Sequence, residues 1–315
     1  MKILLIDVYN FNKGGAESVC FNTGKMLEEH GNEVVYFTLK WKQNSPSPFE
    51  KYFPKSKETR SGPLRTVKNI EKEHICCAIS NNNDIQVSSK KAWLSERFED
   101  GLVFLKSTER GKCFIEYIPA ENAWNPILAD GYMYIDCLWV AGSFKGHGYS
   151  TDLLDACIED SKDKGKKGLC ILASAKKKPF LADPKFLKYK GFRVCDEADN
   201  GIQLWYYPFD ENVELPKFKE CAKQPYIEEK GYVLYYTSQC PFNAKYVPVI
   251  EDIAREKSVQ FKAIHLQSKE EAQNAPTPIT TYALFLDGDY ITNEQMNDKR
   301  FLKLLEKQSF NNTER

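Results

Sequence analysis

Residues 133–166 combine a strand pattern, a short loop with two glycines and an amphipathic helix pattern, in that order. The stretch MYIDCLWV has the apolar and β-branched content of a strand, and TDLLDACIEDSKDKGK repeats apolar residues with helical spacing. Between them lies SFKGHGYS, residues 143–150. The two glycines therefore lie between the end of a predicted strand and the start of a predicted helix.

The loop itself has the chemistry of an anion site. The first N–H groups of a helix lack intrahelical partners and carry partial positive charge, so small residues in front of them let the main chain wrap a phosphate. Gly146 and Gly148 meet this requirement because neither has a Cβ to hold the phosphate away. A plain strand-to-helix turn also uses glycines, so the motif alone leaves both interpretations open.

Composition excludes several classes of partner. The 315 residues exceed the usual size of one domain. The 44 basic and 44 acidic side chains leave no net charge to attract nucleic acid. No leader sequence and no apolar run of roughly 20 residues is found, which predicts a cytoplasmic protein without membrane contact. The 10 cysteines form no CxxC pair, so we expect buried thiols and no metal site.

The order of patterns divides the chain into pieces. Residues 1–45 predict a βαβ fragment, and 46–66, rich in proline and polar residues, predict a linker. Strands and helices alternate over 67–210. A second linker is expected over 211–230, a further strand–helix–strand unit over 231–305, and a tail over 306–315.

The loop resembles the pyrophosphate loop of the GNAT superfamily of N-acetyltransferases, whose pattern is Arg or Gln, two residues, Gly, one residue, Gly or Ala. Ser143, Gly146 and Gly148 occupy the three defined positions. The resemblance extends upstream to an apolar-x-Val strand end and downstream to Gly191-Phe192 after a late helix. It covers about residues 67–209 and implies a mixed sheet flanked by helices, with acetyl-CoA as cosubstrate.

By this resemblance, a splayed strand over 135–140 would offer main-chain groups to the pantetheine arm of acetyl-CoA. N–H groups over 144–149 would take its pyrophosphate. The predicted cofactor-binding residues are Leu138, Trp139, Val140, Ser143, Phe144, Lys145, Gly146, His147, Gly148 and Tyr149.

Two positions depart from the family pattern. Ser143 replaces the usual Arg or Gln, which removes one side chain that helps to fix the loop. Leu187 stands where many members place a tyrosine that protonates the leaving thiolate. Tyr189 lies two residues further on, on another helix face, and is not assigned that role.

A carboxylate is sufficient to remove a proton from an ammonium nucleophile, directly or through water. The candidates are Asp136, Glu116 and Glu121. Strand alternation predicts Asp136 on the face opposite Cys137 and Trp139. For each carboxylate a solvated surface role is the alternative.

The C-terminal unit resembles a thioredoxin-like fold, because a strand ends at Cys240-Pro241 and a helix follows. A helix N-terminus stabilises a thiolate, which predicts a lowered pKa for Cys240. Asn243 occupies the place of a second redox cysteine, so a monothiol and a purely structural domain are both open. Pro276 or Pro278 would be the cis-proline of such a fold.

Together, residues 67–303 resemble YoaP-type acetyltransferases. Residues 1–60 instead resemble the first βαβ unit of GT-B glycosyltransferases, with Gly14-Gly15 as the donor loop. No second Rossmann-like domain follows, so a working glycosyltransferase is not expected.

The sequence therefore predicts an acetyl-CoA-dependent N-acetyltransferase that transfers an acetyl group to a small-molecule amine by direct attack on the thioester. The alternative is a non-catalytic acyl-CoA-binding module joined to a monothiol redox domain. A scaffold in which both domains are degenerate is the third possibility.

Overall fold

The structure, a computed structural model, describes residues 2–7, 16–38, 64–77, 79, 81–108 and 113–313. The chain divides into two compact units, residues 1–59 and 60–315. Within the described ranges, no helix is sufficiently long and apolar to cross a membrane.

The first unit contains the expected strand, helix and strand. These are β1 (Lys2–Asp7), α1 (Ala16–Glu29) and β2 (Glu33–Thr38). The two strands are parallel and pair from Lys2 with Glu33 to Asp7 with Thr38. The Gly14-Gly15 loop and most of the predicted linker over 46–66 lie outside the described residues.

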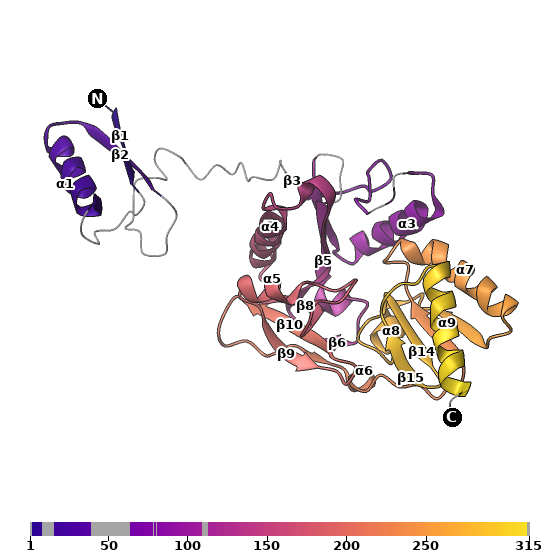
Figure 1. Cartoon of the computed structure of the whole chain (residues 1–315). Helices are drawn as coiled ribbons and strands as arrows, with labels where there is room; N and C mark the ends of the chain where they lie inside the picture. The colour runs from indigo at the N-terminus through magenta and orange to yellow at the C-terminus, as the bar shows by residue number, and fades with distance from the viewer. Residues whose placement is uncertain are drawn as a thin grey trace. The chain divides into compact units, whose positions relative to one another are not determined.

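The second unit is built on a mixed sheet of seven described strands, in the order β3-β4-β5-β7-β8-β10-β9 (Figure 1). Neighbouring strands are antiparallel except for β7 and β8, which are parallel. The strands are β3 (Leu64–Val67), β4 (Val103–Ser107), β5 (Cys113–Pro119), β7 (Tyr132–Val140), β8 (Gly168–Ser174), β9 (Arg193–Glu197) and β10 (Ile202–Pro208).

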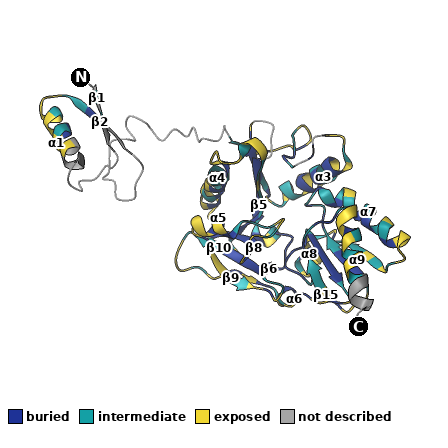
Figure 2. Cartoon of the chain, viewed as in Figure 1, coloured by how far each residue is buried: buried dark blue, intermediate teal, exposed yellow. Residues whose placement is uncertain are grey.

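Helices cover both faces of this sheet. On one face, α4 (Tyr149–Asp163) and α5 (Pro184–Tyr189) pack Leu153, Leu154 and Leu187 onto the strands. On the other, α3 (Ile85–Glu99) contributes Trp93 and Leu94 to a second core. Figure 2 shows the central strands in the colour of buried residues and the outer sides of the helices as exposed. The predicted mixed sheet flanked by helices is confirmed.

Short elements connect this sheet to the C-terminal region. They include the 3₁₀ helix η1 (Ala120–Asn122), whereas a second 3₁₀ helix, η2 (Gly142–Phe144), lies between β7 and α4. The two-residue strand β6 (Ile127–Leu128) pairs with β11 (Lys217–Phe218), which is followed by α6 (Glu220–Lys223). Part of the segment predicted as a linker over 211–230 is thus ordered against the sheet domain.

The C-terminal region forms a second mixed sheet, in the order β13-β12-β14-β15. Strand β12 (Tyr232–Tyr236) is parallel to β13 (Phe261–His265) and antiparallel to β14 (Tyr282–Leu286), and β15 (Asp289–Thr292) closes a hairpin. The helices are α7 (Phe242–Glu256), α8 (Lys269–Gln273) and α9 (Asp298–Thr313). The expected strand–helix–strand order and the hairpin are both present.

The predicted cis-proline is wrong. No cis peptide bond occurs among the described residues, which include Pro276 and Pro278. This segment is instead part of the contact with the neighbouring sheet, because the Pro278 carbonyl accepts a hydrogen bond from Asn125 Nδ2 at 3.0 Å.

The two sheets of the second unit share one core. Leu266, Ala275 and Ile279 of the C-terminal region belong to the same apolar cluster as Trp93 and Trp124. Helix α3 also packs against α7, and the two lie side by side in Figure 1. The C-terminal region therefore covers the α3 face of the larger sheet.

Candidate functional site

The sheet opens between β7 and β8. These strands pair only from Tyr132 with Gly168 to Tyr134 with Cys170, whereas β7 continues to Val140. Over 135–140, β7 has β5 as its partner on one side and no pairing with β8 on the other. That side of β7 has no strand partner among the described residues, and the role that the GNAT resemblance predicts for it stays a prediction.

A β-bulge in β7 changes the direction of the residues that follow it. Glu116 pairs with Cys137 and Tyr117 pairs with Ile135, so the register skips Asp136. Cys137 therefore packs with the core on the α3 face, although Ile135 packs with the core on the α4 face. Strand alternation predicts Asp136 and Cys137 on opposite faces, and this prediction is wrong because a bulge interrupts alternation.

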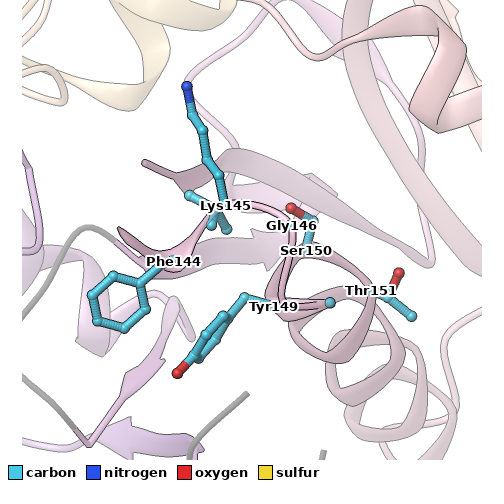
Figure 3. Close-up of a pocket in the computed structure, with 8 residues that line it drawn as sticks. Phe144, Lys145, Gly146, Tyr149, Ser150 and Thr151 are labelled. Atoms are coloured by element: carbon cyan, nitrogen blue, oxygen red, sulfur yellow. The ribbon is translucent and has the colours of Figure 1, made fainter. Parts of the chain in front are cut away.

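The glycine loop follows β7 directly and leads into α4. Gly142, Gly146 and Gly148 have φ of 64°, 80° and 87°, in the left-handed region that favours glycine. A Cβ built on Gly146 would meet no atom within 4 Å. Gly146 and Gly148 line a pocket of about 140 Å³ at the start of α4, shown in Figure 3.

The main chain of the loop supplies some of the expected donors. The N–H groups of Gly146, His147 and Gly148 make no hydrogen bond to described residues. The Lys145 N–H instead donates to Gly142 O at 3.2 Å, inside η2. Within the predicted range 144–149, the Lys145 amide is thus occupied by the 3₁₀ turn, and the amides of Gly146, His147 and Gly148 keep the predicted role.

Side chains of the predicted cofactor residues point in different directions. Leu138 and Val140 pack against the core on the α4 face, and Trp139 is exposed. The rings of Phe144 and Tyr149 contact each other at a centroid distance of 4.9 Å on one side of the loop, and Lys145 extends on the other (Figure 3). The residues Ser143, Lys145 and His147 are exposed.

Glu116 is fully buried in an ion pair. Its Oε2 lies 2.6 Å from Lys90 Nζ, and Lys90, on α3, is 2% exposed. Burial raises the pKa of Glu116, and the Lys90 ammonium opposes that rise. The other carboxylate oxygen, Oε1, is buried and has no hydrogen-bond partner in the part of the chain that the structure describes.

Asp136 lies beside this ion pair. Burial raises the pKa of Asp136 to about 8, with a further rise from the Glu116 charge, whereas Lys90 and Arg97 lower it. Gln239, from the C-terminal region, places Nε2 at 3.4 Å from both Asp136 Oδ1 and Asp136 O. A carboxyl with a pKa near neutral is suited to general-base catalysis.

The third carboxylate does not join the other two. Glu121 lies on η1, where it forms a surface ion pair with Lys166 at 3.1 Å and its side chain is 42% exposed. At the position of the family's tyrosine, Leu187 is buried, and Tyr189 is 82% exposed on the outside of α5. The structure thus brings together Asp136 and Glu116.

Cys240 lies two residues before the first residue of α7, and the strand before it, β12, ends at Tyr236 instead of at Cys240-Pro241. Burial raises the pKa of the Cys240 thiol above the usual value. The expectation of a lowered pKa is wrong because the loss of hydration outweighs the hydrogen bonds from Gln295 and the Phe242 N–H. Asn243 Nδ2 donates to the carbonyls of Thr237 at 3.0 Å and Thr281 at 2.6 Å. Asn243, in the position of the second redox cysteine, thus connects the start of α7 to the segments after β12 and before β14 by hydrogen bonds.

Comparison with known proteins supports the two parts of this unit separately. A family model described as the acetyltransferase (GNAT) family matches residues 67–178, and one described as YoaP-like matches residues 260–303. YoaP of Bacillus subtilis strain 168, described as an uncharacterized N-acetyltransferase, is 44% identical over 241 residues, which cover 76% of this chain and 96% of that protein.

The chain belongs to the YoaP-like GNAT acetyltransferases. This membership confirms the predicted enzyme class, an acetyl-CoA-dependent N-acetyltransferase. The resemblance of residues 1–60 to GT-B glycosyltransferases is not supported by the comparisons.

Solved structures also resemble part of the chain. The ribosomal-protein-alanine N-acetyltransferase of Brucella melitensis is 17% identical, with 47% of this chain and 99% of that one covered at a TM-score of 0.34. A GNAT family acetyltransferase of the same organism, solved with acetyl-CoA, is 14% identical, with 50% and 92% covered at a TM-score of 0.33.

Two residues of this GNAT site were not predicted from the sequence. Lys90 falls on the apolar stripe of α3, between Val87 and Leu94, and a charged residue in such a stripe is a signal for a buried ion pair. Gln239 lies more than 100 residues from Asp136 in the chain, so no local pattern connects them.

Proposed function

We propose that the acceptor is the amine of a small molecule, that it attacks the thioester of acetyl-CoA directly, and that Asp136 accepts its proton. Acetyl-CoA supplies the activated acetyl group. The chain supplies the loop at α4 for the pyrophosphate, the free side of β7 for the pantetheine arm, and the carboxylate.

The observation that carries this proposal is the position of Asp136. It is the bulged residue of β7, at the point where that strand has just separated from β8 and a few residues before the glycine loop. A bound thioester that follows the free side of β7 toward the loop would pass this residue. Its raised pKa, about 8, suits a group that must accept a proton near neutral pH.

The loop residues support the same assignment. The unpaired amides of Gly146, His147 and Gly148 surround the N-terminal end of α4, where partial positive charge favours a phosphate. The open space at Gly146 leaves room for that phosphate to approach the main chain. Ser143 adds no charge, so main-chain donors would carry most of the binding.

Release of free CoA from acetyl-CoA in the presence of small amines tests the proposal. We expect at least one amine in a panel of alkylamines, amino alcohols and amino acids to accelerate CoA release above the hydrolysis background. Acetyl-CoA should also raise the melting temperature, because a ligand of the folded state stabilises it.

Stabilisation without turnover for any amine would contradict the proposal. It would favour the alternative of an acyl-CoA-binding module, for which the buried Leu187 at the acid position is the relevant observation. Absence of both effects would contradict the cosubstrate as well.

A further inference from the structure

We infer that the C-terminal region supplies one wall of the acceptor site, and that Gln239 positions the carboxylate of Asp136. This inference rests on the proposed function. Most of the residues that carry it come from strands β5 and β7, helix α3 and the turn before α7, and Cys77 and Gln295 come from the segments before α3 and before α9.

The turn before α7 lies directly against the bulge of β7. Gln239 is 7% exposed, and its Nε2 approaches the carboxylate and the carbonyl of Asp136 at 3.4 Å. The next residue, Cys240, interacts electrostatically with Lys90 and Glu116. Cys137 on β7 interacts with the same ion pair and with Cys240. The turn therefore borders the group of residues around the proposed base.

Several of these residues are partly exposed to solvent although most of their surroundings are protein. Asp136, Cys137, Cys240 and Cys77 each keep a partly exposed side, yet burial raises the pKa of each one. Burial keeps the three thiols protonated, so they act as small neutral groups of the wall.

Three side chains that contact Asp136, Lys90 or Cys240 each carry a buried oxygen without a hydrogen-bond partner among the described residues. Glu116 Oε1, Gln239 Oε1 and Gln295 Oε1 accept no hydrogen bond from the described residues. Gln295 is 8% exposed and reaches the Cys240 thiol through its amide. A buried acceptor without a donor costs free energy, which a ligand that carries donors would recover.

The charges around Asp136 point to the same class of ligand. Glu116 is paired with Lys90. Arg97 pairs with Asp100 Oδ2 at 2.7 Å from its Nε and with Glu96 Oε2 at 3.5 Å from its Nη2, whereas its Nη1 is buried without a hydrogen-bond partner among the described residues. Tyr134 and Cys170, whose pKa values the charge of Asp136 also raises, stay neutral, because burial raises the pKa of each.

The three acceptor oxygens of Glu116, Gln239 and Gln295 therefore favour an amine that carries a further N–H or O–H donor over one that carries a carboxylate. Three compounds with the same three-carbon chain separate the classes: 1,3-diaminopropane, 3-amino-1-propanol and β-alanine. We expect the first two to exceed β-alanine in kcat/KM by about 10-fold or more, the discrimination of one buried hydrogen bond. Equal or better turnover of β-alanine would overturn this assignment.

The role of Gln239 is tested by Gln239→Leu with Gln273→Leu as the matched control. Gln273 also crosses between the two sheets, since its Nε2 donates to Glu121 O at 3.1 Å and Ala123 O at 2.9 Å, but it touches neither Asp136 nor Cys240. We expect Gln239→Leu to lower kcat/KM for the amine about 10-fold and to move the pH midpoint of activity upward, because the carboxylate loses a donor. Acetyl-CoA affinity, measured by calorimetry, should stay unchanged.

Gln239→Glu provides a second variant of the same size, in case the leucine variant does not fold. Its carboxylate would repel Asp136 and should move the pH midpoint upward as well. If wild type acetylates amines while Gln239→Glu and Gln273→Leu share its pH profile, this inference alone is overturned. If wild type acetylates none of the amines, the proposed function and this inference both fail.

Discussion

Asp136 and Glu116 are adjacent carboxyl groups with different surroundings. Glu116 is fully buried and paired with Lys90, whereas Asp136 keeps an accessible side and has only a long contact with Gln239. An ion pair of this kind is a structural element, because either partner alone would be an uncompensated buried charge. This difference is the reason why our proposal assigns proton exchange to Asp136 and not to Glu116.

The pKa of Asp136 predicts the pH dependence of the reaction. Below about pH 8 the carboxyl keeps its proton and cannot accept another, and above it the carboxylate is the main form. We expect kcat/KM for the amine to rise with pH and to level off above about 8. Asp136→Asn should lower kcat by about 100-fold and remove this rise. Steady-state rates between pH 6 and 10 measure both effects.

The matched control is Glu121→Gln, which removes a surface carboxylate from the Lys166 ion pair. It should keep the wild-type pH profile. If Asp136→Asn leaves the pH dependence of kcat/KM unchanged, Asp136 is not the general base.

At the scale of elements, helix α3 is attached to β5 by the Lys90–Glu116 pair at 2.6 Å. Lys90→Met leaves Glu116 buried without its cation, and we expect a loss of about 3–5 kcal/mol in the free energy of unfolding. The double variant with Glu116→Leu removes both charges and should recover most of that loss. Urea denaturation gives both values. A double variant as unstable as the single one would show that packing, not charge, determines the effect.

The loop at the start of α4 predicts a separation of binding from stability. Gly146 and Gly165 both have positive φ, of 80° and 68°, and a Cβ on either meets no atom within 4 Å. Alanine should therefore cost the fold a similar amount at both positions, about 1–2 kcal/mol. Only Gly146→Ala places a methyl group in the pocket at the start of α4. We expect Gly146→Ala to weaken acetyl-CoA binding at least 10-fold in calorimetry. Gly165→Ala, the matched control, should leave acetyl-CoA affinity unchanged.

Much of the strand–loop–helix segment over 133–166 was predictable from the sequence. The strand, the glycine loop and the helix over 133–166 were located by apolar periodicity and glycine spacing, which are local properties. The bulge at Asp136 was not, because a bulge depends on how β5 and β7 align and not on either strand alone. For the same reason the faces assigned by alternation failed at Asp136.

At the scale of the whole chain, the fold class was predictable and the contact between the two sheets was not. Each sheet leaves a periodic pattern in the sequence, but hydrogen bonds such as Asn125 to Pro278 join residues 153 positions apart. The raised pKa of Cys240 has the same origin. The helix N-terminus is visible in the sequence, whereas the burial that opposes it comes from the neighbouring sheet.

The division into two compact units predicts the effect of a deletion. Residues 60–315 hold both matched family regions, and the B. subtilis relative aligns over 241 residues. We expect a chain that starts at Arg60 to bind acetyl-CoA with the affinity of the full chain, within about 2-fold. Calorimetry on both proteins measures this. A larger loss would assign the first unit a part in the site.

Leu266, Ala275 and Ile279 belong to the same apolar core as Trp93 and Trp124. The two sheets should therefore unfold together and not as separate units. Residues 60–315 should unfold in a single thermal transition. If the gene is divided between the two sheets, each half should expose its part of the shared apolar core and aggregate. Because the two sheets share one core, either sheet could be replaced in evolution only together with matching changes in the other.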